Sequence, residues 1–269
     1  MAPIGGGATI DRMFKRLVYA FYQRRLEALV RGGNLPGHVG VILDGNRRFA
    51  RKSGLASISA GHRMGADKAE ELLAWCDDLR IPVVSVWALS TDNLGRDDDE
   101  LATIFAIVED KIAALGAAQG KSKQRRIRAV GRLELLPEST RDAIRKVEAD
   151  TADYGPYELI VAVGYGGREE ITDAVRRMIS DHLARGESLE GIASGLEPDE
   201  IGRYMYAADV PDPDLIIRTS GELRLSGFLL WQSAYSEYYF CDVYWPEFRR
   251  IDFLRALRSY ERRQRRRGL

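Results

Sequence analysis

The chain has 269 residues, of which 45% are hydrophobic and 30% are charged. This balance is typical of a soluble globular protein and excludes a disordered or collagen-like chain. Forty lysines and arginines balance forty acidic residues, so no overall positive charge attracts nucleic acid. Anion binding must therefore come from local clusters of arginine.

The two cysteines, Cys76 and Cys241, both lie in apolar runs. Two thiols cannot build a disulfide framework or a zinc site alone, and they indicate a reducing cytoplasm. No apolar run approaches the ~20 residues that a membrane span requires. Basic residues also interrupt the first apolar stretch before it could form a secretory leader. We therefore expect a cytoplasmic protein.

The first predicted element is an amphipathic helix over residues 8–31, with apolar residues at helical spacing and basic residues between them. Two interpretations are open. The helix packs on its own domain and exposes a basic face, or it lies on the inner face of the cell membrane as a peripheral contact. A glycine-rich break at Gly32–Gly37 separates this N-terminal helix, residues 1–33, from a predicted catalytic domain over residues 34–269.

Six short apolar runs follow the break. Four of them are rich in Val and Ile and lack polar alternation, as expected for strands that are covered on both faces. Helical periodicity occupies segments between them, most clearly over residues 101–115. This alternation predicts a single α/β domain with a mostly parallel six-stranded sheet and helices on both faces. The predicted strands are Val39–Leu43, Val83–Leu89, Ile127–Val130, Leu159–Val163, Leu215–Ile217 and Tyr238–Cys241.

Polar clusters follow three of these strands directly, and the first begins with Asp44 and Gly45. In open parallel sheets, ligands bind beyond the carboxyl ends of the strands. Gly45 allows a ligand close to the backbone, and Asp44 is a candidate Mg²⁺ ligand because Mg²⁺ prefers one or two carboxylates with substrate phosphates. An ordinary Asp-Gly turn followed by surface arginines explains the segment equally well. A carboxylate at a strand end buries little apolar area, so we expect its removal to cost little stability.

The second cluster, residues 90–96, combines hydroxyls, an amide and a guanidinium, which suit an anionic ligand. A capped loop before the next helix is an equal alternative. The third cluster, residues 218–226, places Arg218 and Arg224 around a flexible glycine, with Ser226 beyond them. Two arginines in this arrangement can hold one diphosphate from several sides.

Five blocks of sequence, in order from about His38 to Gly268, resemble the motifs of the cis-prenyltransferases, the undecaprenyl diphosphate synthase family. The segments that carry the resemblance are His38–Ala50, Gly61–Gly65, Ser90–Arg96, Tyr165–Arg168, and Asp214–Glu222 with its continuation through Phe228–Gln232 to Glu237.

The resemblance implies an enzyme that condenses an allylic diphosphate with isopentenyl diphosphate and creates a Z double bond. It implies that Asp44 holds Mg²⁺ on the allylic diphosphate and that Asn93 assists proton removal from isopentenyl diphosphate. By the same resemblance, Phe49 lines the prenyl site, His62 stands near the leaving group, and the allylic phosphates are cradled by Gly45, Asn46, Arg47 and Arg48. The substrate loop is formed by Ser90, Thr91, Asp92, Leu94 and Arg96. Isopentenyl diphosphate is bound by Arg218, Arg224, Leu225 and Ser226.

The resemblance also implies a homodimer with Mg²⁺ as its cofactor. Glu237 matches a second metal-site carboxylate of the family near the dimer interface. Arg266, in the sequence Arg266-Arg267-Gly268, matches a segment that reaches the diphosphate site of a neighbouring subunit. No nucleic-acid partner is expected, because the arginines near the C-terminus complement a helix dipole.

Departures from the family pattern concern the length of the product. No arginine stands in Ser53–Gly61, where the family usually carries one, and Leu94 and Leu223 replace a usual Trp and a frequent His. Trp87 and Leu89 place bulk on the strand that helps to wall the family's product tunnel. We therefore expect a short product, (2Z,6E)-farnesyl diphosphate, made from geranyl diphosphate. The alternatives are a long-chain polyprenyl (decaprenyl or undecaprenyl) diphosphate synthase and, more distantly, a non-catalytic partner subunit of the same fold.

Overall fold

The computed structural model describes residues 7–117 and 125–266, with side chains over residues 18–117 and 125–263. Two compact units divide the chain. One is the α/β unit Pro36–Phe248, and the other joins the described residues up to Leu35 to those from Arg249 onward.

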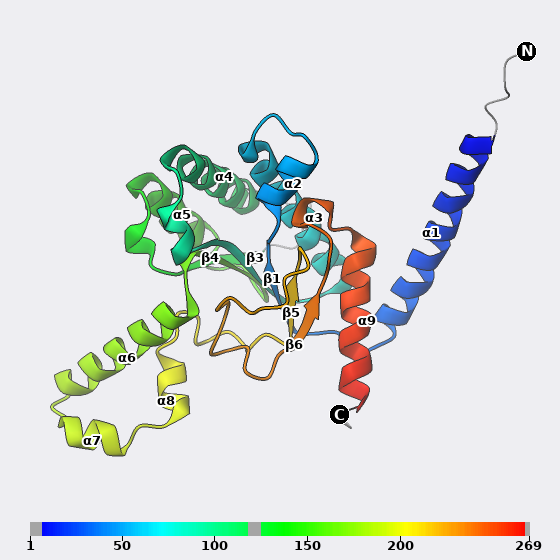
Figure 1. The fold of residues 1–269 in the computed structure, drawn as a ribbon. Helices are drawn as coiled ribbons and strands as arrows, with labels where there is room; N and C mark the ends of the chain where they lie inside the picture. Colours follow the sequence, from blue (N-terminus) through cyan, green and yellow to red (C-terminus); the bar gives the residue numbers. More distant parts are fainter. Residues whose placement is uncertain (1–6, 118–124, 267–269) are drawn as a thin grey trace, which may run out of the picture. The chain divides into compact units, whose positions relative to one another are not determined.

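The α/β unit is built on one six-stranded sheet in the order β3-β4-β2-β1-β5-β6 (Figure 1). All five strand pairings are parallel, which confirms the predicted α/β fold and its parallel sheet. The apolar runs predicted each strand to within two residues at every end, with the largest differences at the start of β3 and at both ends of β4. The strands are β1 (His38–Ile42), β2 (Val83–Ser90), β3 (Arg125–Val130), β4 (Tyr157–Tyr165), β5 (Leu215–Arg218) and β6 (Glu237–Phe240).

Parallel pairing requires a crossover connection, and helices supply it between successive strands from β1 to β5. The described residues 219–236, which connect β5 to β6, form turns and contain no helix. The helices of the α/β unit are α2 (Asn46–Lys52) and α3 (Ile58–Leu79) after β1, α4 (Asp98–Ala117) after β2, α5 (Glu138–Asp150) after β3, and α6 (Gly167–Ala184), α7 (Leu189–Ser194) and α8 (Pro198–Arg203) after β4. Short 3₁₀ turns lie at η1 (Thr91–Gly95), η2 (Leu133–Leu135) and η3 (Trp245–Glu247).

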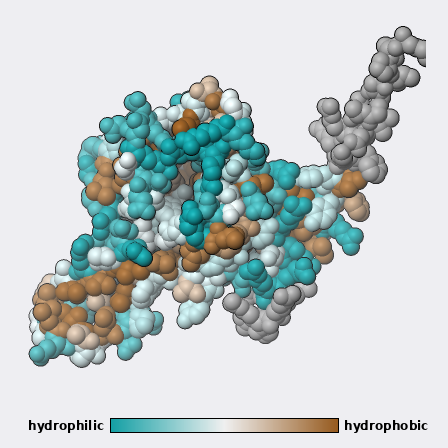
Figure 2. All heavy atoms as spheres, in the orientation of Figure 1, coloured by the Kyte–Doolittle hydropathy of each residue, from teal (hydrophilic) through white to brown (hydrophobic). Residues whose placement is uncertain are grey.

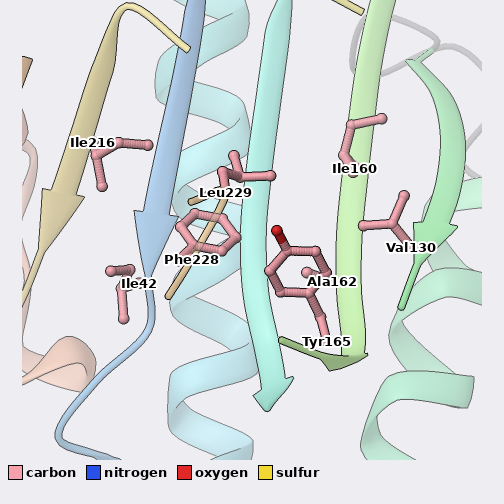
Figure 3. Close-up of a cluster of buried hydrophobic side chains, with 8 residues drawn as sticks. All are labelled: Ile42, Val130, Ile160, Ala162, Tyr165, Ile216, Phe228 and Leu229. Atoms are coloured by element: carbon pink, nitrogen blue, oxygen red, sulfur yellow. The ribbon is translucent and has the colours of Figure 1, made fainter. Parts of the chain in front are cut away.

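The two faces of the sheet are covered differently. On one face, Val86 of β2 and Val161 of β4 border an apolar cavity together with α3 and α4. On the other face, Ile160 packs in a buried cluster with Phe228 and Leu229, which lie across the strands on the side away from the helix behind them (Figure 3). The packing of Phe228 and Leu229 on this face anchors the end of the third polar cluster, because only Gly227 separates that cluster from Phe228 in the chain.

The second unit pairs α1 (Gly7–Arg31) with α9 (Arg250–Arg266), so the predicted N-terminal helix is confirmed. An ion pair joins the two helices, from Arg250 Nη2 to Glu27 Oε1 at 2.8 Å. In the part of the chain that the structure describes, no helix is both long and apolar enough to cross a membrane.

Candidate active site

A polar cavity of about 590 Å³ lies at the carboxyl ends of β1, β2 and β5, and it brings the three polar clusters together. Figure 2 shows a hollow rimmed by hydrophilic side chains in the region of α2 and α4. The predicted residues on its lining are Asp44, Gly45, Asn46, Arg47, Arg48, His62, Ser90, Asp92, Asn93, Arg96, Arg218, Arg224 and Ser226.

Asp44 is held between two arginines from different parts of the chain. Its Oδ2 accepts from Arg218 Nη2 at 2.9 Å and its Oδ1 accepts from Arg48 Nη2 at 3.1 Å. Burial alone would raise the pKa of Asp44, but the hydrogen bonds and charges of Arg218 and Arg48 outweigh it and lower that pKa. Asp44 is therefore an ionised carboxylate at neutral pH.

The side chain of Arg218 is only 5% exposed, so the carboxylate neutralises a buried charge. This corrects the expectation that removing Asp44 costs little stability. That expectation counted apolar area and overlooked the ion pair.

Gly45 has a positive φ of 109° and precedes the first turn of α2. A Cβ at this position would lie 2.8 Å from Cδ1 of Tyr244, so both the backbone angle and the space require glycine. The tight turn lets Arg48 reach across to the third cluster, where it donates to Ser220 Oγ at 2.7 Å and to Glu222 Oε1 at 2.9 Å.

The second cluster is ordered by its own polar contacts. Ser90 Oγ accepts from the backbone N–H of Asn93 at 3.2 Å and caps η1. Asn93 Oδ1 accepts from Arg96 Nε at 3.0 Å. The capped loop is therefore confirmed, and Ser90, Asn93 and Arg96 also border the polar cavity.

Glu100 organises this side of the cavity, although the sequence analysis did not select it. Its Oε1 accepts from His62 Nε2 and from Arg96 Nη1, both at 3.0 Å, and it lies 3.6 Å from Arg47 Nε. Burial lowers the pKa of His62, and Glu100 opposes this effect only in part. An acid four residues after Arg96 was the available signal, but acids opening a helix are also explained by the dipole alone.

In the third cluster, Arg218 Nη1 donates to Ser226 Oγ at 2.7 Å and to the carbonyl of Arg224. Its Nε is buried and has no hydrogen-bond partner among the described residues. Arg224 pairs with Glu222 at 2.5 Å, and its side chain is 66% exposed. Arg218 is therefore fixed, whereas Arg224 can turn toward a bound anion.

Several predicted residues do not line this cavity. Phe49 is buried in α2, and Leu94 and Leu225 also lie outside the described lining, while Thr91 borders a neighbouring cavity of about 420 Å³. The side chain of Arg266 lies outside the described residues.

Glu237 stands apart from Asp44 within one chain. It pairs in register with Leu215 at the amino end of β5, whereas Asp44 follows the carboxyl end of β1. The two carboxylates therefore belong to opposite ends of the sheet and cannot hold one ion together in a single subunit.

A second cavity, of about 110 Å³, runs between the sheet and the helices α3 and α4. It shares Leu43, Asn46, His62 and Ala88 with the polar cavity, so the two are adjoining. Its remaining lining is mainly apolar: Gly65, Ala66, Ala69, Glu70, Leu73, Val86, Ile104, Ile107, Val108, Lys111, Ile112, Leu115, Leu159 and Val161.

Trp87 and Leu89 border the polar cavity and not this apolar cavity, so their bulk does not fill the apolar cavity. Trp87 instead stacks on Phe228, with ring centroids 5.4 Å apart, in the cluster on the opposite face. Alternate residues of a strand point to opposite faces, and Val86 and Ala88 are the residues of β2 that face the cavity.

Asp44 is the residue best suited to hold Mg²⁺. Its carboxylate is ionised, borders the polar cavity and is 27% exposed. Over the described residues, no group of three or more His, Cys, Asp or Glu could hold a metal by itself. A single carboxylate fits Mg²⁺ that completes its coordination with substrate phosphates.

The family described as "Putative undecaprenyl diphosphate synthase" matches residues 42–268. The chain belongs to this family, the cis-prenyltransferases. It is 52% identical to an isoprenyl transferase of Deinococcus radiodurans over 94% of this chain and 92% of the relative. It is 53% identical to a (2Z,6E)-farnesyl diphosphate synthase of Thermobifida fusca over 93% of this chain and 97% of the relative.

Other similar proteins differ in the product that their names state. One is a tritrans,polycis-undecaprenyl-diphosphate synthase (geranylgeranyl-diphosphate specific) of Methanopyrus kandleri, 51% identical over 96% of this chain and 93% of the relative. The structure of lavandulyl diphosphate synthase from Lavandula x intermedia in complex with dimethylallyl diphosphate superposes with a TM-score of 0.77 at 32% identity, covering 84% of this chain and 95% of that chain. This cis-prenyltransferase is therefore a prenyl-transferring enzyme.

Proposed function

We propose that this cis-prenyltransferase is Mg²⁺-dependent and joins an allylic diphosphate to isopentenyl diphosphate, forming a short Z-prenyl diphosphate. The observation that carries the proposal is the joining of two cavities of opposite character. An apolar cavity adjoins the polar cavity at Ala88. The polar cavity is lined by six arginines: Arg47, Arg48, Arg51, Arg96, Arg218 and Arg224. An amphipathic substrate with a diphosphate head and a hydrocarbon tail fits this pair.

The reaction begins when the allylic C–O bond breaks and its electron pair leaves with the diphosphate. Arginines already placed around the head group stabilise that charge without reorganising. Arg47 and Arg48 border this position from α2, next to Asp44. Magnesium bound at Asp44 would add positive charge to the departing oxygens.

Isopentenyl diphosphate then attacks with its terminal alkene carbon, and a proton leaves its second carbon to form the new double bond. We assign its diphosphate to Arg218, Arg224 and Ser226, which the structure groups on one side of the polar cavity. Asn93, which Arg96 orients on the other side, is assigned to assist removal of this proton, which passes to the diphosphate released from the allylic substrate. The apolar cavity excludes water from the cation.

For the product we propose (2Z,6E)-farnesyl diphosphate from geranyl diphosphate. The likeness to the Thermobifida fusca farnesyl diphosphate synthase and the modest apolar cavity of about 110 Å³ support it. A long-chain product is the second candidate, favoured by the likeness to the Methanopyrus kandleri enzyme.

Chromatography of labelled products decides between the two. The purified chain is given geranyl or farnesyl diphosphate with radiolabelled isopentenyl diphosphate and Mg²⁺. A single fifteen-carbon product from geranyl diphosphate supports the short-chain proposal. A ladder of long polyprenyls replaces it with the second candidate, and no product from any allylic substrate contradicts the enzyme assignment.

We further propose that the enzyme works as a cytoplasmic homodimer in which Glu237 and Arg266 act at the subunit interface, as the resemblance implies. Sedimentation equilibrium tests the dimer. A monomer at assay concentration with full activity would contradict it.

Peripheral membrane contact is proposed for α1, where exposed apolar side chains lie among basic residues. Phe21 is 69% exposed and Leu29 is 45% exposed, and Arg24 and Arg25 lie between them. Such a surface suits an anionic lipid headgroup layer. Flotation with phosphatidylglycerol vesicles tests the contact, and equal recovery with phosphatidylcholine vesicles would contradict the charge contribution.

A further inference from the structure

A charged cluster lies beside the apolar cavity, on the seam between α3 and α4. Lys111 Nζ of α4 donates to Asp67 Oδ1 at 2.5 Å and to Glu70 Oε1 at 2.7 Å, both on α3. Lys111 and Glu70 also border the apolar cavity itself. The ion pairs therefore bridge the two helices at the wall of the space that takes the prenyl tail.

The location of these charges is unusual within the cavity lining. The other polar side chains on it, Asn46 and His62, lie where it adjoins the polar cavity. Glu70 lies about two helical turns beyond His62 on α3. Lys111 pairs with Glu70 from α4. Charges at that depth are not needed to bind a diphosphate.

Small residues explain why the charged cluster closes this part of the wall. On α3, the positions facing the cavity between His62 and Glu70 are Gly65, Ala66 and Ala69, which leave room for a ligand but provide no bulk across the seam. The methylene stem of Lys111 can cover the opening while its ammonium group stays at the surface. Its side chain is 29% exposed, whereas Asp67 is 66% exposed.

The ion pairs can also open. Pairs with exposed partners contribute little stability, because water solvates the separated charges. Burial lowers the pKa of Lys111, but its hydrogen bonds to Asp67 and Glu70 outweigh this and raise it. Lys111 thus remains charged at neutral pH and keeps both acidic partners.

We propose that Lys111, Asp67 and Glu70 form a side gate of the prenyl cavity that limits the length of the product. A tail that outgrows the cavity must part α3 from α4 at this seam. Release of the shorter product competes with that opening. The inference rests on the proposed function, because it assigns the apolar cavity to a growing prenyl tail.

The test compares product lengths from the full-length enzyme and its variants, given geranyl diphosphate and labelled isopentenyl diphosphate. Lys111→Ala removes the stem and both ion pairs. The double variant Asp67→Asn/Glu70→Gln keeps the side chain of Lys111 but removes the charge of both its acidic partners. For both variants, we expect the fraction of products longer than the main wild-type product to rise about threefold or more. A change of this size corresponds to the free energy of one weak ion pair. Lys111→Arg, which retains the charge, is expected to keep the wild-type distribution.

Glu71→Gln provides a matched control. It breaks the ion pair of Glu71 with Lys68 at 2.8 Å, which lies within α3 and does not bridge to α4. We expect no change in product length from this variant. A rise equal to that of Lys111→Ala would overturn the gate, because loss of any surface charge on α3 would then suffice.

Thermal unfolding identifies any variant that fails to fold, and the double variant and Lys111→Ala report independently. Normal condensation by both with a wild-type distribution of products overturns the gate alone. Absence of any condensation by the unaltered chain overturns the proposed function, and the gate with it.

Discussion

Replacing Asp44 by alanine should impair both the activity and the stability of the enzyme. The variant leaves Arg218 charged and 5% exposed without its carboxylate, although Arg218 keeps its contacts with Ser226 and the carbonyl of Arg224. Breaking a fully buried pair costs roughly 3–5 kcal/mol. Because Asp44 is 27% exposed and Arg218 keeps other acceptors, we expect a loss of about 2 kcal/mol in the free energy of unfolding.

For a chain of this size, that loss corresponds to a fall in Tm of about 4–8 °C. Activity should fall much further, by about 10³-fold in kcat, because the variant lacks the carboxylate that is proposed to hold Mg²⁺ and that positions Arg48 and Arg218 beside the leaving diphosphate. Differential scanning calorimetry gives the first quantity and incorporation of labelled isopentenyl diphosphate gives the second. Adding Arg218→Met should restore part of the lost stability, since the unpaired buried charge is gone, but no activity. An unchanged Tm in Asp44→Ala would refute the ion-pair reasoning, and near wild-type Mg²⁺-dependent turnover would refute the assignment of Asp44.

The same contacts make the stability difference depend on pH. The pKa of Asp44 is lowered in the folded enzyme because Arg218 and Arg48 outweigh the opposing effect of burial. A carboxyl of this kind contributes stability fully above its unfolded pKa of about 3.9 and loses that contribution as the pH falls through the folded value. The Tm values of the wild type and Asp44→Ala should therefore differ fully between about pH 5 and 8 and converge below about pH 4.

Three further substitutions test other parts of the site. Arg224→Ala should raise the KM for isopentenyl diphosphate about tenfold with a smaller effect on kcat, since its side chain is 66% exposed and binds mainly the ground state; an unchanged KM in steady-state kinetics would contradict its role. Ala88→Leu should fill the passage where the polar and apolar cavities adjoin and favour a shorter allylic substrate, measured as the ratio of kcat/KM for dimethylallyl and geranyl diphosphates; an unaltered ratio would argue against that passage. Glu100→Gln should lower the pKa of His62 further, because Glu100 opposes the effect of burial, and an NMR titration that finds this pKa unmoved would contradict the pairing.

The strands and the polar clusters were predictable because each depends on residues close together in the chain. Runs rich in Val and Ile predict covered strands, and a parallel sheet places their carboxyl ends at one edge. That reasoning predicts Asp44, Asn93 and Arg218 at one edge of the sheet, and all three border the polar cavity. The ion pair between Asp44 and Arg218 was not predictable, because it requires β1 and β5 to be neighbours although they are far apart in the chain.

The sequence also did not predict which face of the sheet each strand residue occupies. Apolar strands that are buried on both sides carry no polar alternation, so the sequence does not indicate which residues of β2 face α3 and α4. Trp87 was expected at the wall of the product tunnel for this reason, and Ala88 proved to be the residue of β2 that borders both cavities. A register shift after Trp87 adds to the difficulty. Glu100 was missed because its local role at a helix start concealed its long-range contact with His62.

The geometry of the newly formed double bond tests the central assignment most directly. The purified chain would be given geranyl diphosphate, isopentenyl diphosphate and Mg²⁺, and the product would be dephosphorylated and characterised by NMR. We predict one added isoprene unit whose new double bond, between the second and third carbons counted from the hydroxyl end, is Z, and no such product when Mg²⁺ is chelated. An E configuration of the newly formed double bond, or an intact allylic diphosphate after prolonged incubation, would contradict the account.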